Sequence, residues 1–431
     1  MIRFLYNLLF PFALLVFLPG YVLKMRRRGN YREKFGQRLG IYDRETRRRL
    51  SAGHQTWVHA VSVGEVMIAL KLVARMKQSE PDLRIALTTT TTTGFALANR
   101  QARPWIEVLY TPLDFLPIMR RAFALIRPER IVLVEAEVWP NLTAIAHRKN
   151  VPLALVNARL SPRSERRFRK FRTFVRPYFQ MLNLICVQEP ADVERWASLG
   201  VAKSRLHVVG SIKFDPEETA RPSSHPREVL NALGIDPARP ILLGGSTHSG
   251  EEEILARTFL ALRQTFPSLF LILAPRHVER AQEIARRLRE LGVQPVFRSE
   301  TTENAGAGDC LLLDTTGELR DWYAVATIVF IGKSLTARGG QNPVEAIVAD
   351  RPVIFGPHME NFASLARALV AAGGALQPND EAGLTDFAAR LLRDAEARAT
   401  LVRHAHIVLD AHRGATGRTA QLLQQLHSLR V

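Results

Sequence analysis

The sequence predicts an α/β protein with two Rossmann-like domains, a cleft between them and an N-terminal membrane anchor helix. After residue 50, short apolar runs alternate with helical stretches, and this alternation occurs in two halves separated by a segment rich in Pro, Ser and charge. Alternation of this kind is typical of parallel sheets covered by helices. The chain has 431 residues, which is enough for two domains with full cores.

The first segment of the chain is an apolar run from Ile2 to Leu23. A few residues interrupt it: Arg3, Asn7, Pro11 and Pro19. Crossing a bilayer takes about 20 apolar residues, and a basic flank beginning at Lys24 follows instead of a small-residue cleavage site. We therefore expect an uncleaved anchor, with the larger part of the chain on the cytoplasmic side. Two alternatives stay open, a helix that spans the bilayer and a helix that lies in the interface.

Charge and cysteine content narrow the class of partner. The formal net charge is +18, and Lys and Arg cluster in residues 24–50 and 163–176. Nucleic acid is one partner for such clusters, but the preceding anchor favours an anionic membrane surface, so we expect no nucleic acid. Cys186 and Cys310 lie far apart in apolar surroundings, which indicates reduced thiols in a cytosolic compartment.

The alternating pattern defines the expected domains. We expect an anchor over 1–25, a first Rossmann-like domain over 26–214, a linker over 215–226 and a second Rossmann-like domain over 227–431. The last helix, near Thr416–Leu429, is a candidate to cross back to the first domain. The expected strands of the first half lie near 56–61, 84–89, 107–110, 130–135, 152–157, 184–188 and 206–209. Those of the second half lie near 240–244, 269–274, 294–297, 310–313, 327–331 and 352–355.

Glu65 is the first candidate for a catalytic residue. The apolar run 57–61 ends at Ser62, and a helical pattern begins at Val66, so Glu65 falls between a strand end and the first turn of a helix. Ligands of open α/β sheets bind at the carboxyl ends of the strands, where a carboxylate can serve as a general base. The alternative is an acidic residue that only complements the helix dipole.

Other polar side chains of the first half also follow expected strands. Glu135 and Glu137 come directly after the apolar run 130–134, and Arg159 and Lys213 follow later runs. Carboxylates at the end of a buried strand are costly unless they are exposed or paired. We expect these side chains to face the cleft; salt bridging between the domains is the alternative.

The second half carries loops suited to an anion. Ser246 and Thr247 belong to a Gly-rich strand-to-helix loop, where hydroxyls, backbone and a helix N-terminus favour phosphate. Pro275 and Arg276 place a cation at a strand end, and Gly339–Glu345 forms a loop that enters a helix through a proline. Taken singly, these features are equally typical of a helix cap, a solvated cation and a turn. Three such loops in one domain indicate a nucleotide-bearing ligand.

Familiar cofactor motifs are missing from the sequence. The first strand ends in Ser-Val-Gly-Glu and lacks the Gly-x-Gly-x-x-Gly of dinucleotide sites. The segment Gly332-Lys333-Ser334 imitates the end of a P-loop, but Thr327 stands where that motif requires glycine. The 12 histidines are scattered, so we expect no metal site and no cofactor.

The candidate residues lie in motifs that resemble the Kdo transferases, the membrane-anchored 3-deoxy-D-manno-octulosonic acid transferases of lipopolysaccharide synthesis. The motifs are His59-Ala-Val-Ser-Val-Gly-Glu65, Glu135-x-Glu-x-Trp-Pro-Asn141, Asn157-Ala-Arg-Leu-Ser161, Gly210-Ser-x-Lys-Phe-Asp215, Ser246-Thr-His248, Pro275-Arg-His277 and Arg338-Gly-Gly-x-Asn-Pro-x-Glu345. They are long, ordered and unusual. Residues beyond Asn361 add little to the resemblance.

The resemblance implies a GT-B glycosyltransferase architecture and an inverting, metal-independent reaction. Kdo would move from CMP-Kdo, bound by the second domain, to a tetraacylated lipid A precursor (lipid IVA) at the inner membrane. It implies that Glu65 is the proton acceptor, and that Glu135 and Lys213 stabilise the transition state. The implied donor-binding residues are Ser246, Thr247, Pro275, Arg276, Thr316, Gly317, Glu318, Asn342, Pro343, Val344 and Glu345. Thr316 and Val344 are side-chain variants within their motifs, so backbone contacts are expected there.

Two other functions remain as alternatives. One is a different GT-B glycosyltransferase, or a sugar epimerase of that fold, that uses a UDP-sugar. The other is a membrane-tethered module that binds polyanions without chemistry, which the basic clusters allow. The second alternative gives no reason for carboxylates at strand ends.

Overall fold

The computed structural model of the chain describes residues 2–27, 34–160, 162–216, 225–236, 238–301 and 308–428. It divides into two compact units. Unit 1 comprises Met1–Asp215 together with His412–Val431, and unit 2 comprises Pro216–Ala411. The last helix, α18 (Ala415–Ser428), therefore belongs to unit 1. Most of the expected linker, residues 217–224, lies outside the described residues.

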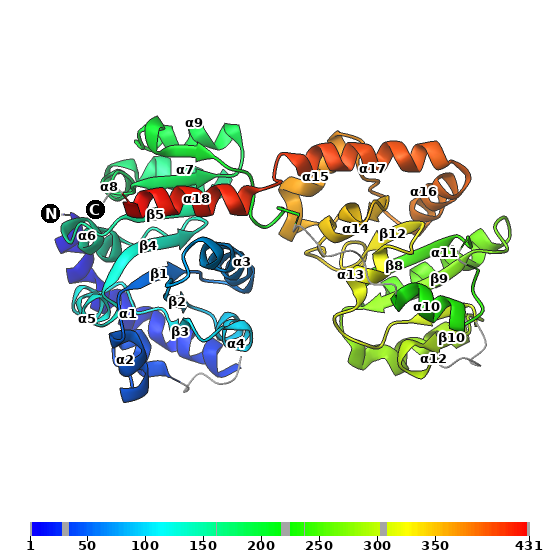
Figure 1. Cartoon of the computed structure of the whole chain (residues 1–431), viewed down its shortest axis with the longest axis horizontal. Helices are drawn as coiled ribbons and strands as arrows, with labels where there is room; N and C mark the ends of the chain where they lie inside the picture. Colours follow the sequence, from blue (N-terminus) through cyan, green and yellow to red (C-terminus); the bar gives the residue numbers. More distant parts are fainter. Residues whose placement is uncertain are drawn as a thin grey trace. The chain divides into compact units, whose positions relative to one another are not determined.

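Unit 1 is built on a parallel sheet of seven strands in the order β3-β2-β1-β4-β5-β6-β7 (Figure 1). Their bounds are β1 Gln55–His59, β2 Ile85–Thr89, β3 Ile106–Tyr110, β4 Pro128–Val134, β5 Leu153–Ala158, β6 Leu184–Val187 and β7 Leu206–Val208. Strands covered on both faces read as apolar runs rather than alternating ones. The seven strand predictions for the first half are confirmed.

Helices cover both faces of this sheet. The face with Val58 and Val132 packs against α3 (Val63–Ser79), α4 (Thr92–Gln101) and α18. The face with Trp57 and Ile131 packs against the helices α2 (Arg44–Ser51), α5 (Leu116–Ile126), α6 (Pro140–Arg148), α8 (Arg172–Phe179) and α9 (Pro190–Ser198). The unit also contains η1 (Phe35–Leu39), α7 (Pro162–Lys170) and η2 (Lys203–Arg205). In Figure 1, α18 (red) lies along unit 1, and its Leu423 joins the same core as Val66 of α3.

Unit 2 repeats the plan with a parallel sheet in the order β10-β11-β9-β8-β12-β13. The strands are β8 Ile241–Thr247, β9 Phe270–Pro275, β10 Pro295–Phe297, β11 Cys310–Leu312, β12 Ile328–Ile331 and β13 Val353–Phe355. The helices are α10 His225–Ala232, α11 Glu251–Arg263, α12 Ala281–Glu290, α13 Leu319–Tyr323, α14 Val344–Val348, α15 Ala363–Ala371, α16 Glu381–Arg393 and α17 Ala395–Asp410, with η3 Val278–Arg280, η4 Arg298–Glu300 and η5 Glu360–Phe362. The six strand predictions for the second half are confirmed as well.

The expected anchor segment forms one helix, α1 (Ile2–Arg27). Within the described ranges, no helix is both long enough and apolar enough to cross a membrane. Of the two alternatives that the sequence left open for the anchor, α1 does not meet the requirement for spanning the bilayer.

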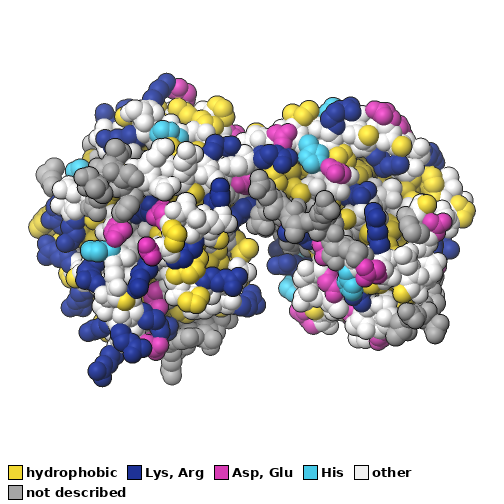
Figure 2. Space-filling view, viewed as in Figure 1, with side chains coloured by type: hydrophobic (Ala, Val, Ile, Leu, Met, Phe, Trp, Pro, Cys, Tyr) yellow, Lys and Arg dark blue, Asp and Glu magenta, His cyan; other side chains and the backbone are white. Residues whose placement is uncertain are grey.

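Some of the basic residues expected at the surface after the anchor are buried or paired with acidic residues in the folded unit. Arg38 is only 4% exposed; its guanidinium lies 4.2 Å from the Tyr110 ring centroid and donates to the Thr90 carbonyl. Arg49 pairs with Glu107 at the surface. Figure 2 shows other Lys and Arg side chains along the side of unit 1 where α2 and α5 lie. Arg38 is thus unable to reach lipid head groups.

Candidate active site

The candidate site in unit 1 lies at the point where the strand order of its sheet reverses. Chain order runs from β1 to β2 on one side, whereas β4 pairs with β1 on the other side, with His59 opposite Leu133. The carboxyl ends of two such strands border a crevice in which ligands of open α/β sheets bind. Glu65 follows β1 and Glu135 follows β4. The topology therefore brings both predicted carboxylates to this crevice.

Glu65 sits in the first turn of α3 and is 9% exposed. The helix begins at a capping box, in which Ser62 Oγ donates to Glu65 Oε1 over 2.9 Å and accepts from the Glu65 N–H. Glu65 Oε2 accepts the Val61 N–H at 2.9 Å. Glu65 therefore has a structural role at the start of α3, because its side chain caps that helix.

Burial gives the Glu65 carboxyl a second property. Desolvation, helped by the negative charges of Glu135 and Glu137, raises its pKa to about 7, although the hydrogen bonds from the Val61 N–H and the Ser62 hydroxyl oppose the shift. A carboxyl with its pKa near neutrality accepts a proton more readily than an ordinary one. Capping alone would lower the pKa, so the raised value reflects the crevice rather than the cap.

Glu135 and Lys213 lie close enough to interact electrostatically. The Glu135 backbone has a φ of 63°, a conformation that is strained for a non-glycine residue. Burial lowers the pKa of Lys213, the charge of Glu135 raises it, and the charge of Arg159 lowers it. Burial and the neighbouring Glu135 also raise the pKa of Glu137, which Arg167 opposes. The structure thus brings together Glu65, Glu135, Glu137, Arg159 and Lys213 at one edge of the sheet.

The loop that carries Lys213 is fixed from two sides. Asn157, at the end of β5 with a φ of 50°, accepts the Ile212 N–H at 3.0 Å and the Ser211 hydroxyl at 3.3 Å. His412 Nδ1 accepts the Ser211 N–H at 3.2 Å. The loop ends at Asp215, which accepts the N–H groups of Gly414 (2.7 Å) and Thr416 (2.8 Å) at the start of α18. The returning C-terminal segment therefore holds the Lys213 loop.

The strand order of unit 2 reverses between β8 and β12. Backbone N–H groups from the two loops that follow these strands donate to the same carboxylate. Glu251, fully buried at the start of α11, accepts the N–H groups of His248, Lys333, Ser334 and Leu335 over 2.7–3.0 Å. Its charge takes the place at the helix N-terminus that an outside anion would favour. Those four N–H groups are therefore committed to Glu251.

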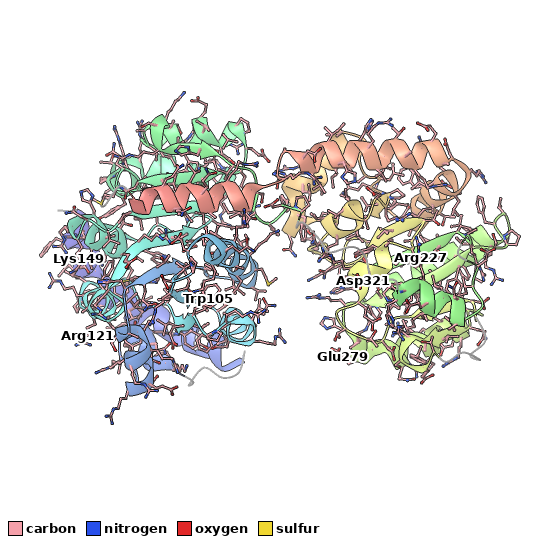
Figure 3. The ribbon with its side chains drawn as sticks, viewed as in Figure 1. Trp105, Arg121, Lys149, Arg227, Glu279 and Asp321 are labelled. Carbon is pink, nitrogen blue, oxygen red and sulfur yellow. The ribbon has the colours of Figure 1, made fainter. Side chains whose placement is uncertain are left out.

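Cationic and imidazole side chains lie close to the loops that Glu251 joins. The His248 and His277 rings are 5.7 Å apart, and the positive charge of Lys333 lowers the pKa of His248, after desolvation as the main cause. Arg276 is exposed at the end of β9, and its backbone N–H donates to the Thr247 carbonyl. His277 Nδ1 lies 3.3 Å from Glu279, which Figure 3 labels. These side chains suit a ligand with negative charge.

The predicted glycine pair has a packing role. A Cβ on Gly244 would lie 2.5 Å from Leu255, and one on Gly245 would lie 2.6 Å from the Tyr323 hydroxyl. A side chain at either position would therefore force Leu255 or Tyr323 to move, which favours glycine there. Ser246 adopts a φ of 54°, and the pairing of β8 with β9 shifts its register between Gly245 and Thr247.

The other residues that the sequence predicts to bind the donor lie at two further loops. Gly317 has a φ of 93°, and Glu318, next to it, accepts from Arg298 at 3.2 Å and from the Trp322 indole at 3.3 Å. Asn342 Oδ1 accepts the Val344 N–H at the start of α14. Thr316 and Glu345 are exposed, whereas Pro343 and Val344 are buried, in keeping with backbone rather than side-chain contacts for Val344.

Several residues important to the site escaped sequence reasoning. Glu251 looked like one of three ordinary helix-start acids, and Lys333 belonged to a discarded P-loop resemblance. His412 lies some two hundred positions from the loop it supports, so no local pattern signals it. For Glu251, the available signal was its place directly after a Gly-bearing turn at a strand end.

Comparison with known proteins identifies one family. The family model described as 3-deoxy-D-manno-octulosonic-acid transferase (kdotransferase) matches residues 33–216. The chain is 33% identical over 398 residues to the 3-deoxy-D-manno-octulosonic acid transferase of Haemophilus influenzae, covering 91% of both proteins. It is 36% identical over 377 residues to that of Bordetella pertussis, covering 85% of this chain and 86% of that protein.

A solved structure supports the architecture. The UDP-GlcNAc 2-epimerase from Neisseria meningitidis bound to UDP-GlcNAc matches with a TM-score of 0.56 over 86% of this chain and 99% of that chain. The sequence identity is 12%, so this likeness concerns the fold alone. The predicted two-sheet, GT-B-like fold is confirmed.

Proposed function

This chain belongs to the 3-deoxy-D-manno-octulosonic acid (Kdo) transferase family, and from that premise we propose how it moves Kdo from CMP-Kdo to a lipid acceptor. As a Kdo transferase it is a glycosyltransferase of lipopolysaccharide core biosynthesis. The finer proposal is an inverting transfer, without an essential metal, to a hydroxyl of a tetraacylated lipid A precursor. The observation that carries it is the placement of Glu65 and Glu135 at the ends of the paired strands β1 and β4.

In the proposed reaction, Glu65 takes the proton of the attacking sugar hydroxyl. The hydroxyl oxygen forms a bond to the anomeric carbon of Kdo, and the bond from that carbon to the phosphate oxygen of CMP breaks. The electron pair of the broken bond leaves with CMP. Because the nucleophile attacks from the side opposite the leaving group, the anomeric configuration inverts. A pKa of about 7 at Glu65 suits this transfer, since about half of the carboxyl groups are ionised at pH 7 and each holds a proton better than an ordinary glutamate does.

Lys213 and Glu135 are proposed to stabilise the transition state. The reaction moves negative charge onto the CMP phosphate while positive charge develops at the anomeric carbon. Fixed charges that face such changes lower the barrier without reorganisation. Asn157 and Asp215 hold the loop of Lys213, and Glu135 directly follows β4 with a φ of 63°.

The donor is proposed to bind unit 2. Arg276, His248 and Lys333 supply charge and hydrogen-bond donors for the phosphate, and Ser246 and Thr247 lie at the same strand end. The segments 316–318 and 342–345 are proposed to bind the rest of CMP-Kdo. With cations of the protein at the phosphate, the leaving group is neutralised by side chains.

The acceptor and the location follow from unit 1. The lipid A precursor carries phosphates and acyl chains, and basic residues of unit 1, together with α1, would hold it at the cytoplasmic face of the inner membrane. In this proposal α1 lies along the anionic membrane surface.

A competition experiment tests the donor. Purified protein is incubated with a lipid A precursor and CMP-Kdo, and CMP or UDP is added as competitor. We expect CMP to inhibit and UDP to have no effect at the same concentration. Inhibition by UDP alone would favour a UDP-sugar enzyme, and binding of RNA without binding of either nucleotide would favour a polyanion-binding module.

A further inference from the structure

Helix α1 is tied into unit 1 by its first turns. Asn7 exchanges two hydrogen bonds with the Asn141 side chain, each 2.9 Å, and accepts the Leu116 N–H at 3.0 Å. The rings of Phe10 and Phe115 stack with their centroids 5.3 Å apart. Asn141 also donates its N–H to the buried Asp114. The N-terminal helix is therefore a part of the wall of this unit.

An apolar groove of about 300 Å³ lies between α1, α6 and α8. Its lining includes Leu5, Leu9, Val138, Phe174, Val175 and Phe179. Binding sites for small molecules span about 300–1,000 Å³, so the groove has room for one slender apolar group. Polar atoms contribute little to its walls, which excludes a sugar or a nucleotide as its occupant.

The groove is lined in part by the loop that carries Glu135, one of the two proposed catalytic carboxylates. Val138 in its wall directly follows Glu137, and Pro140 begins α6. Glu137 interacts with the charges of both Glu135 and Arg167. A molecule seated in the groove would therefore have its polar end beside the crevice of Glu65 and Glu135.

Positive charge borders the groove at two places. The charge of Arg3 acts on Tyr178, which lines the groove. Arg167 acts on Glu137 and stands next to Phe168, another lining residue. An apolar slot with cations at its rim is complementary to an amphiphile that carries both an acyl chain and a phosphate.

We propose that this groove binds one fatty acyl chain of the acceptor lipid and thereby selects acceptors by chain length. The inference rests on the proposed function for the identity of the acceptor, and adds a binding site for its hydrophobic part. Each methylene group moved from water into such a groove contributes roughly a fourfold gain in affinity. Chain length should therefore appear in KM for the acceptor rather than in kcat.

Two neighbouring leucines of α1 make a matched test. Leu9 lines the groove and Leu8 does not, while their exposed fractions are 52% and 53%. Leu9→Trp should fill the groove, and Leu8→Trp should leave it open. Kinetics are measured with acceptors that share one phosphorylated disaccharide and bear either long or short acyl chains, both kept below the concentrations at which they form micelles, so that the chains enter the groove from water. We expect Leu9→Trp to reduce the preference for the long chain at least tenfold through KM, with the short-chain rate kept, and Leu8→Trp to behave as wild type.

A second pair of variants tests the proposal even if the leucine variants fail to fold. Phe174 lines the groove and is 51% exposed, whereas Phe171 is outside it and 48% exposed. Phe174→Ala should widen the groove and move the preference toward longer or bulkier chains, with Phe171→Ala unchanged. Equal chain-length preference in all four variants would overturn the proposal. So would an equal loss of vesicle binding in Leu8→Trp and Leu9→Trp without any change in preference, because the face would then be a general membrane contact.

The proposed function fails in a different way. If the wild-type protein transferred Kdo to neither the long-chain nor the short-chain acceptor, the acceptor assignment would be wrong, and the occupant of the groove with it. If it transferred Kdo to both acceptors equally, only the groove inference would fail.

Discussion

The carboxyl of Glu65 and the carboxyl of Glu135 interact across the reversal point of the first sheet. Glu65 follows β1 and Glu135 follows β4, the two strands pair directly, and the charge of Glu135 helps to raise the pKa of Glu65. Like charges at adjacent strand ends oppose folding. Their presence at the place where α/β sheets bind ligands is the physical reason to regard Glu65 as more than a helix cap.

The pH dependence of transfer should report the ionisation of Glu65. A base works only when it is deprotonated, so kcat/KM should fall as the pH drops below about 7, the pKa that burial gives Glu65. Glu137→Gln removes a negative charge that raises this pKa, so the acidic limb should move to lower pH. The measurement is kcat/KM between pH 5 and 9 for both proteins. A limb that stays in place, or moves upward, would contradict the assignment.

Lys213 should affect the rate more than acceptor or donor binding. Lys213→Met removes the charge while keeping the length of the side chain, and we expect kcat to fall by roughly 10²–10³-fold with little change in KM. Lys71→Met is the control, because the Lys71 ammonium donates to the Asp215 carbonyl on the same loop. A comparable loss of kcat in both variants would mean that the loop, not the charge of Lys213, is responsible.

Glu251 should hold unit 2 together. Glu251→Gln turns an NH₂ group toward backbone N–H groups that the carboxylate now accepts, which should lower the free energy of unfolding by about 3 kcal/mol and weaken CMP binding. Glu253→Gln, which loses a partly exposed ion pair with Arg287, should cost at most about 1 kcal/mol. Urea unfolding and CMP titration measure both effects. Equal stability in the two variants would contradict the claim that the hydrogen bonds of Glu251 stabilise unit 2.

The contacts of Asn7 predict that α1 stabilises unit 1. Asn7→Ala removes the acceptor of the Leu116 N–H and the donor to Asn141 Oδ1, which should cost about 1–3 kcal/mol in the unfolding of unit 1, while the Asn141 amide keeps its bond to the Asp114 carbonyl. Asn99→Ala is the control, since Asn99 is exposed and bonds only within α4 among the contacts described. If both variants unfold at the same urea concentration, the contacts of Asn7 add nothing to stability.

Chelation tests the proposed independence from metals. We expect the transfer rate to stay the same after treatment with EDTA, because cations of the protein are proposed to neutralise the CMP phosphate. Transfer that is lost with EDTA and recovered with Mg²⁺ would contradict this part of the proposal.

The sequence was sufficient to locate the strands because strand burial leaves a direct trace in the pattern. The expected runs near 130–135 and 240–244 correspond to β4 and β8, each an apolar stretch bounded by polar residues. Glu65, Glu135 and Lys213 were singled out as candidates for the same reason, since polar residues at strand ends stand out against such runs.

Contacts between distant parts of the chain were beyond the sequence. No local pattern indicates that Asp215 accepts N–H groups at the start of α18, or that Asn7 bonds to Asn141. The Gly-rich segment with Ser246 and Thr247 was interpreted as a loop that favours phosphate, whereas in the structure Leu255 and Tyr323 occupy the space next to its Gly244 and Gly245. Glycines that permit packing and glycines that permit ligand contact look alike in a sequence.

Glu65→Gln tests the central claim most directly. A capping box accepts Glu or Gln at this position, so the variant keeps the start of α3 and loses only the base. Wild type and variant are each incubated with CMP-Kdo and a lipid A precursor, and the acceptor is analysed by mass spectrometry. We predict that wild type adds Kdo and that Glu65→Gln, folded as wild type, adds it about 10²–10⁴-fold more slowly. An acceptor unchanged by wild type, or modified equally fast by the variant, would contradict the account.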